Sequence, residues 1–281
     1  MARPCHIACA QTEPKADWAQ ALAQAVSLAD SAHGAGAELV VFPEYCGGLS
    51  SQGRAFTPPV APESEHLVVQ GLLEWAAKKR CWIVIGSVAI EGPEGKRINR
   101  GFVVDDTGHI VARYDKIHMF DIALSEDKQF RESDTVDPGS KAVVVNTPFG
   151  RLGLTICYDL RFPQLYRDLS QAGAEILLAP SAFTKATGEA HWHVLNRARA
   201  IENGAFVVSA CAVGRIDGGG QSYGHSLIVN PWGEIIADGG SLPGVIHSII
   251  DLDEVANART KIPSLSHDKP YTLITESRAV A

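Results

Sequence analysis

Cys157 is the residue whose setting most strongly suggests chemistry. It follows the apolar run Gly153 to Ile156, and Pro163 beyond it is typical of the first turn of a helix. We therefore expect a strand-to-helix elbow with the thiol at its corner. Unpaired N–H groups and the positive end of a helix dipole would lower the pKa of this thiol and leave donors for an oxyanion. That geometry suits a nucleophile. The same sequence also fits a buried cysteine that only closes a strand.

A cysteine that attacks a carbonyl needs a base, a donor for the oxyanion and an acid for the departing amine. Glu44 directly follows an apolar run and a proline, and Lys116 directly follows a predicted hairpin. No histidine has a comparable position. Glu44 is the candidate for the proton transfers and Lys116 the candidate for stabilising the developing charge. Taken singly, each also fits a solvated charge at the end of an element.

The elements that must position these residues occur twice along the chain. Each half contains, in order, a strand, a helix, a strand, a helix, a strand and a hairpin. In the first half these are His6 to Thr12, Trp18 to Gly34, Leu39 to Phe42, about Glu65 to Lys79, Trp82 to Val88 and Gly101 to Tyr114, followed by a polar loop from about Ala123 to Pro138.

The second half repeats parts of the first. Ala172 to Pro180 matches Ala35 to Pro43 in five of nine residues. Short crossovers impose a largely parallel order with helices outside, so two such halves stack as two face-to-face sheets between helical layers. We predict an α/β fold, a four-layer α-β-β-α sandwich with an internal pseudo-twofold, in one domain over residues 1–281. The alternative to an internal repeat is that the two halves resemble each other by chance, because apolar strands that contain Gly and Pro look alike.

Composition limits the partners. The formal net charge is −7 with dispersed basic residues, which argues against nucleic acid and anionic membranes. No apolar run is long enough for a membrane span, and the first ten residues lack the apolar core of a signal peptide, so we expect a cytoplasmic protein. The six cysteines include no CxxC pair and the ten histidines no HExxH motif, and His191 and His193 would lie on different helix faces. We expect reduced thiols, no metal and no cofactor.

Four separated motifs, in this order, resemble those of the nitrilase superfamily of carbon–nitrogen hydrolases. They are Phe42-Pro-Glu44-Tyr, Tyr114-Asp-Lys116-Ile-His-Met-Phe120, Phe130-Arg-Glu132-Ser and Gly153-Leu-Thr-Ile-Cys157-Tyr-Asp-Leu-Arg-Phe-Pro163. The resemblance runs from about residue 5 to 275 and implies the same α-β-β-α sandwich. It implies that Glu44, Lys116 and Cys157 form a Glu-Lys-Cys triad and that Glu132 is the second glutamate beside it.

The segment after Cys157 resembles the Nit-type branch, which implies an amidase acting on ω-amides of 2-oxo dicarboxylic acids, such as deaminated glutathione or 2-oxoglutaramate. Tyr158-Asp159 differs from the Cys-Trp-Glu of true nitrilases, and Gln164 and Glu189 stand where many relatives have Glu and Pro. An anionic substrate needs donors, for which Arg161, Thr184, Lys185 and His191 are candidates, with the Tyr158 backbone N–H as an oxyanion donor and Phe183 as a wall. Arg161 could instead cap a helix or pair with Asp159, and His191 could be a packed helix residue.

The C-terminal segment, about residues 251–281, reads as a short helix and an extended tail with several apolar residues. We expect it at a subunit interface of a homodimer or larger homo-oligomer, as the resemblance implies. Three other functions stay open: another carbon–nitrogen hydrolase, such as an N-carbamoyl amino acid hydrolase or aliphatic amidase, a non-catalytic scaffold, and a Cys-His hydrolase.

Overall fold

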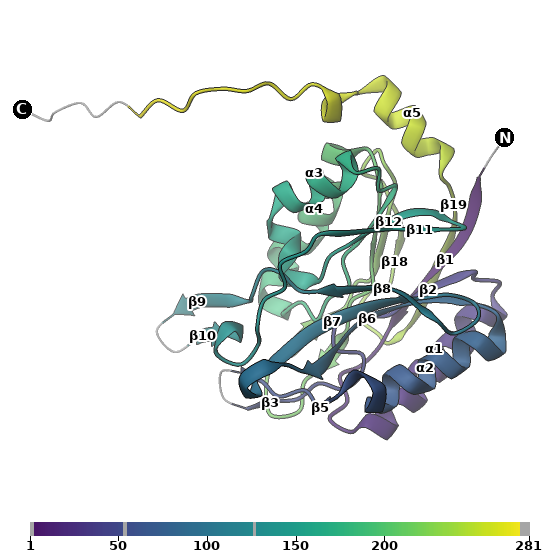
Figure 1. The fold of residues 1–281 in the computed structure, drawn as a ribbon, viewed down its shortest axis with the longest axis vertical. Coiled ribbons are helices and arrows are strands. Elements are labelled where there is room, and N and C mark those ends of the chain that lie inside the picture. The colour runs from purple at the N-terminus through teal and green to yellow at the C-terminus, as the bar shows by residue number, and fades with distance from the viewer. Residues whose placement is uncertain (1–2, 53–54, 126–127, 276–281) are drawn as a thin grey trace, which may run out of the picture.

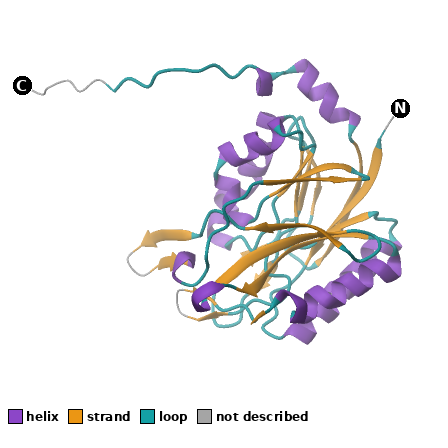
Figure 2. Ribbon diagram, in the orientation of Figure 1, coloured by secondary structure: helices purple, strands orange, loops and turns teal. Residues whose placement is uncertain are grey.

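Two β-sheets packed face to face form the centre of the computed structural model, which describes residues 3–52, 55–125 and 128–275 (Figures 1 and 2). The first sheet has the order β19-β1-β2-β6-β7-β8, with β5 paired to β6, and the second has the order β11-β12-β13-β14-β17-β18. Helices α1 and α2 cover the outer face of the first sheet, and α3 and α4 that of the second (Figure 1). The predicted four-layer α/β sandwich is thereby confirmed.

The strands of the first sheet are β1 (Pro4–Gln11), β2 (Leu39–Val41), β5 (Val60–Ala61), β6 (Trp82–Glu91), β7 (Arg97–Val104), β8 (Ile110–Asp115) and β19 (Gly244–Asp251). Those of the second are β11 (Val143–Thr147), β12 (Gly150–Leu154), β13 (Ile176–Leu178), β14 (Phe206–Ser209), β17 (Leu227–Val229) and β18 (Ile235–Asp238). Two-stranded ribbons pair β3 (Ser51–Gln52) with β4 (Ala55–Phe56), β9 (Asp121–Ser125) with β10 (Lys128–Arg131) and β15 (Val213–Arg215) with β16 (Gln221–Tyr223).

Alternation along the strands divides the core into two layers. In β1, Cys5, Ile7 and Cys9 pack between the sheets, whereas Ala8 and Ala10 pack against the helical layer. This is the period-two pattern of a strand that is buried on both faces. The central strands β1, β2 and β6 pair in parallel, as do β12, β13 and β14. Their carboxyl ends therefore meet in one region between the halves.

The helices have local causes that the sequence shows. Helix α1 (Trp18–Gly34) begins where the Asp17 side chain accepts from the Gln20 N–H, and it buries a stripe of alanines at helical spacing. Helices α2 (Leu67–Lys79) and α4 (Lys185–Asn203) both end at a left-handed residue. Helix α3 (Pro163–Gln171) begins at the predicted proline, and α5 (Asp253–Lys261) follows β19. No helix of the described residues is long and apolar enough to cross a membrane.

The two halves exchange their last strands. Strand β11 follows the first half but pairs with β12 of the second half, and β19 follows the second half but pairs with β1 of the first. Each sheet therefore has an edge strand from the other half, which ties both halves into one packed unit.

One local expectation is wrong. The predicted polar loop from about 123 to 138 contains part of β9, all of β10 and a 3-10 turn at Glu132–Asp134, because Asp121–Ser125 pairs with Lys128–Arg131 as a ribbon. The expected strand-to-helix elbow is present, since β12 ends at Leu154 and α3 begins at the predicted Pro163, and a 3-10 turn, Cys157–Arg161, lies between them.

Gly86 in β6 lies where the loops after β2 and β13 meet. A Cβ at this position would lie 2.5 Å from the Pro43 carbonyl oxygen and 2.6 Å from Pro180 Cβ, and closer still to the Phe42 carbonyl oxygen. A Cβ at Gly244 would meet nothing within 4 Å.

We therefore predict that Gly86→Ala lowers the free energy of unfolding by about 1–3 kcal/mol or more, because the backbone atoms it meets cannot move aside singly. Gly244→Ala is the matched control and should change it by less than about 0.5 kcal/mol. Chemical denaturation measures both. Equal stability of the two variants would contradict the close approach of these loops.

Candidate active site

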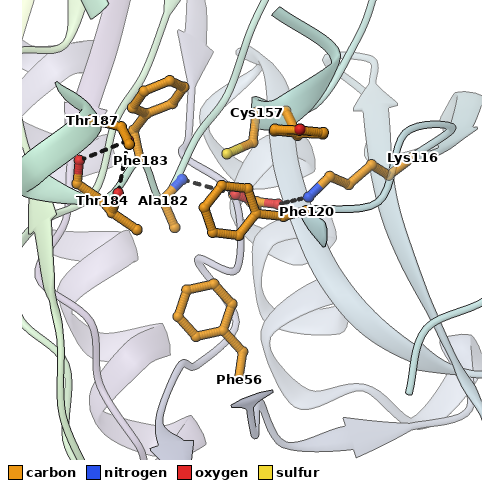
Figure 3. Close-up of a pocket in the computed structure, with 10 residues that line it drawn as sticks. Phe56, Lys116, Phe120, Cys157, Ala182, Phe183, Thr184 and Thr187 are labelled. Atoms are coloured by element: carbon orange, nitrogen blue, oxygen red, sulfur yellow. Dashed lines mark hydrogen bonds and ion pairs between the residues drawn. The ribbon is translucent and has the colours of Figure 1, made fainter. Parts of the chain in front are cut away.

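A pocket opens at the carboxyl ends of the central strands, and it contains polar groups from both halves (Figure 3). Glu44 follows β2, Lys116 follows β8 and Cys157 follows β12. The full lining consists of Glu44, Phe56, Lys116, Phe120, Cys157, Tyr158, Ala182, Phe183, Thr184 and Thr187. Ligand sites in open α/β sheets lie at this end of the strands. The lining found for the described residues includes no histidine, which leaves a Cys-His mechanism without a base.

Lys116 lies between two carboxylates. Its Nζ is 2.9 Å from Glu44 Oε1 and 2.8 Å from Glu132 Oε2, and all three side chains are almost fully buried. Burial opposes the charge on the ammonium, but the charges of Glu132 and Glu44 outweigh it and raise the pKa of Lys116 well above its usual value. The lysine is therefore a permanent cation at the base of the pocket.

Glu44 is held by both carboxylate oxygens. Oε1 accepts from Lys116 and from the Asn99 amide, also at 2.9 Å, and Oε2 accepts from the Ala182 backbone N–H at 2.9 Å. Ala182 belongs to the second half, whereas Asn99 and Lys116 belong to the first. The carboxylate is thus fixed across the junction of the two sheets, in the orientation that faces the pocket.

Glu132 accepts hydrogen bonds from a different set of donors. Its oxygens accept from the Phe120 backbone N–H at 2.7 Å and from the Tyr45 hydroxyl at 3.2 Å, besides Lys116. It does not line the pocket, and its contacts orient Lys116 from the far side. The structure thus brings together all four predicted catalytic residues, with Glu132 behind the other three.

Cys157 has a strained backbone. Its φ is +50°, a left-handed value that is unusual for a residue with a side chain, and its N–H donates to the Pro180 carbonyl at 2.9 Å. In Figure 3 the Cys157 sulfur points into the space between Ala182 and the Lys116 ammonium. The tight turn places this buried thiol in the pocket lining, which favours the nucleophile interpretation.

The predicted acidification of this thiol is wrong. Burial, and next the negative charge of Glu44, raise the pKa of Cys157 well above its usual value, and Lys116 only partly opposes this. The resting sulfur is therefore protonated, because a thiolate would add a second net negative charge to a buried cluster that already has two carboxylates and one ammonium.

Asp159 connects the two segments that carry Lys116 and Cys157. Its carboxylate accepts from the Tyr114 hydroxyl at 2.7 Å, the Ile156 N–H at 2.8 Å and the His118 N–H at 3.0 Å, with His118 Nδ1 at 2.7 Å. Asp159 is fully buried. The alternative that Arg161 pairs with Asp159 is wrong, since His118 and Tyr114 take that place.

The predicted substrate-binding residues fall into two groups. Tyr158, Phe183 and Thr184 line the pocket. Arg161 lies outside the lining, with its guanidinium 5.7 Å from the Tyr158 ring centre and 5.3 Å from that of Phe183, and with Nη1 3.3 Å from His191 Nδ1. Arg161 and His191 thus form a pair at the rim.

Lys185 lies apart from these residues. It is half exposed, and its Nζ is 3.9 Å from Glu189 on the surface of α4.

Several residues at the site were not identified from the sequence. Asn99 and the Ala182 N–H hold Glu44, and Tyr45 holds Glu132. Phe56 and Thr187 line the pocket. Their positions depend on contacts between distant segments, for which no local pattern exists. Only the motif position of Tyr45, beside Glu44, offered a signal.

Comparison with known proteins agrees with this geometry. The model of the carbon–nitrogen hydrolase family matches residues 6–260. The chain is 38% identical to the deaminated glutathione amidase of Yersinia enterocolitica, covering 83% of this chain and 82% of that protein, and 37% identical to the omega-amidase NIT2 of Homo sapiens, covering 81% and 82%. The crystal structure of the NitFhit protein of C. elegans superimposes with a TM-score of 0.86 at 33% identity, over 95% of this chain and 65% of that one. The chain belongs to the carbon–nitrogen hydrolase family.

Proposed function

We propose that this hydrolase cleaves the ω-amide of a 2-oxo dicarboxylic acid, with deaminated glutathione or 2-oxoglutaramate as the substrate type. The observation that carries the proposal is one pocket lined by the Cys157 thiol and by a Glu44 carboxylate that Lys116 holds in place. The relatives named deaminated glutathione amidase and omega-amidase support the substrate class.

In the acylation step, Glu44 takes the thiol proton while the sulfur attacks the amide carbonyl. The oxyanion accepts from the Lys116 ammonium and from the Tyr158 N–H, which lies in the first turn of the 3-10 helix where N–H groups lack helical partners. Glu44 then gives the proton to the amide nitrogen, the C–N bond breaks, and ammonia or an amine leaves. The acyl group remains on Cys157 as a thioester.

In the deacylation step, Glu44 takes a proton from water, whose oxygen attacks the thioester carbonyl. The C–S bond breaks, the sulfur regains the proton, and the carboxylic acid leaves. One carboxylate therefore serves both steps. Its fixed position between Lys116, Asn99 and Ala182 means that little reorganisation is needed between them.

The pocket rim supports an anionic substrate. The Arg161 guanidinium lies over the rings of Tyr158 and Phe183, both of which line the pocket, so it can reach a carboxylate at the pocket mouth. His191 and Thr184 add donors on the α4 side. The aromatic rings would pack on the carbon chain of the substrate.

A turnover assay tests the function. We predict that the purified protein releases ammonia from 2-oxoglutaramate, or a primary amine from deaminated glutathione, faster than ammonia from an N-carbamoyl amino acid or a simple aliphatic amide. Cys157→Ala should abolish this, and Glu44→Gln should lower kcat by about 10²–10⁴. Preference for the carbamoyl compound or the aliphatic amide would overturn the substrate class, and full turnover by Cys157→Ala would overturn the mechanism.

The raised pKa of Cys157 gives a second prediction. Difference ultraviolet titration against Cys157→Ala should show thiolate forming only at a pH above the ordinary value of about 8.5. Glu44→Gln removes a neighbouring negative charge, so the midpoint should move to lower pH while turnover falls. An unchanged midpoint would mean that Glu44 does not act on the sulfur.

Arg161 gives a third prediction about the site. Arg161→Met should raise KM for the 2-oxo acid amide by about tenfold or more, since a charge-assisted hydrogen bond is worth about 1.5–3 kcal/mol. KM for a neutral aliphatic amide should stay the same. Arg80→Gln, at an exposed ion pair with Asp106, is the matched control. Equal loss on both substrates would assign Arg161 to packing alone.

We further propose a cytoplasmic homodimer or larger homo-oligomer with the C-terminal tail at the interface. Tyr271, Leu273 and Ile274 are 89%, 81% and 75% exposed in one protomer, where the tail extends away from the body (Figure 1). Large apolar side chains in that setting favour a partner surface. All six thiols are unpaired, which suits a reducing compartment.

The tail prediction concerns assembly. Replacing Tyr271, Leu273 and Ile274 together with serine should shift the protein toward monomer in sedimentation experiments at equal concentration. Replacing the exposed Val111, on β8, with serine is the control and should leave the mass distribution unchanged. An oligomer that survives the triple change intact would place the interface elsewhere.

A further inference from the structure

A second cluster of chemically capable side chains lies outside the active site. His193 of α4, His225 after β16 and Asp238 at the end of β18 converge, and one ligand atom from each lies within 4.8 Å of the others. His193 Nε2 is 3.0 Å from Asp238 Oδ2, and His225 Nδ1 is 2.9 Å from Asp238 Oδ1. We propose that these three residues bind a divalent transition metal ion of the zinc class.

The spacing suits such an ion. Zinc bonds to imidazole nitrogen and carboxylate oxygen are about 2.0–2.2 Å long, so two ligand atoms of a tetrahedral site lie about 3.4 Å apart. The separations found between 2.9 and 4.8 Å bracket this value, and small side-chain rotations would reach it. Two imidazoles and one carboxylate form a donor set that suits zinc, with the fourth position left to water.

The ligands are held by the fold. His225 has a left-handed backbone with φ of +53°, fixed because its N–H donates to the Gly240 carbonyl at 2.7 Å and its carbonyl accepts from the Trp192 indole at 2.7 Å. Trp192 is fully buried and directly precedes His193. Asp238 Oδ1 accepts from the Gly240 N–H at 2.8 Å. A strained residue that the surroundings hold in this way points to a function.

The electrostatics also favour a cation. The ion pairs of Asp238 in the described chain are those with the two histidines, with no Lys or Arg among them. Tyr223 stacks on the His225 ring at 4.6 Å between centres. The side chains of His193, His225 and Asp238 are 31%, 26% and 34% exposed, so an ion can reach them from solvent.

The site is separate from the catalytic pocket but lies close to one of its walls. The Tyr223 N–H donates to the Phe183 carbonyl at 2.8 Å, and the Tyr223 ring packs against Gly188 of α4. A metal bound by His193 and His225 would therefore fasten the β15–β16 ribbon to α4. We assign it a stabilising role, with no part in the reaction.

Zinc titration calorimetry of the metal-stripped full chain tests the proposal, in a Cys157→Ala background that removes the pocket thiol as a competing ligand. We expect one saturable site, and an increase in Tm on adding zinc. His193→Gln and Asp238→Asn should each weaken binding by at least about tenfold and abolish the Tm increase.

His247→Gln is the matched control, because His6 Nε2 and His247 Nδ1 also lie 3.1 Å apart on the surface, outside the His193 cluster. It should leave the zinc affinity unchanged. Asp238→Asn could disturb the turn at Gly240. The variant His193→Gln, on the helix surface, must therefore also weaken zinc binding, and its Tm without metal must be unchanged. No saturable binding, or binding that His193→Gln leaves intact, would overturn the proposal.

Discussion

The ion cluster of Lys116 between Glu44 and Glu132 is the interaction on which the pocket depends. Taking three charges out of water is expensive, and their mutual attraction compensates only if the remaining lone pairs find donors. Here the donors are present: Asn99, Tyr45 and the N–H groups of Phe120 and Ala182. Removing one member of such a cluster typically costs about 3–5 kcal/mol, because an uncompensated charge stays buried. The same contacts therefore stabilise the fold and hold the reactive geometry.

The charge balance of this cluster determines the state of the sulfur. With two carboxylates and one ammonium, the buried site already has an excess negative charge, and the nearby thiol keeps its proton. In the proposed mechanism, Glu44 accepts the proton as the C–S bond forms, while the new negative charge appears on an oxygen near Lys116. A site that stored a thiolate would place charge on sulfur before the substrate arrives. This site instead develops charge where the lysine can stabilise it.

Sequence patterns predicted much of the fold and of the candidate site, and the predictions that failed have a common cause. The apolar runs before Glu44 and Cys157 placed both at strand ends, and the repeated halves predicted the sandwich, because burial on both faces leaves a clear local signal. Lys116 was a candidate from its position after a predicted hairpin, whereas Glu132 was identified only through the family resemblance, since a charged residue in a loop has no distinctive pattern of its own. The pKa direction of Cys157 was wrong because the helix dipole is a local effect, whereas the causes that raise the pKa are tertiary: first burial, and then the charge of Glu44 from the other half of the chain. Asn99, Ala182 and the ribbon from Asp121 to Arg131 were missed because their contacts are tertiary.

The exchange of edge strands explains why the site needs the whole chain. Glu44, Asn99, Lys116 and Glu132 come from the first half, and Cys157 and Ala182 from the second. Their relative positions are maintained only if the two sheets cannot slide, and β11 and β19, each paired to the other half, prevent sliding at both edges. Asp159 adds a buried connection at the site itself, between the segment of Lys116 and the turn of Cys157. Glu44 and Cys157, which follow strands of different sheets, are therefore held at one pocket by contacts that lie partly far from it.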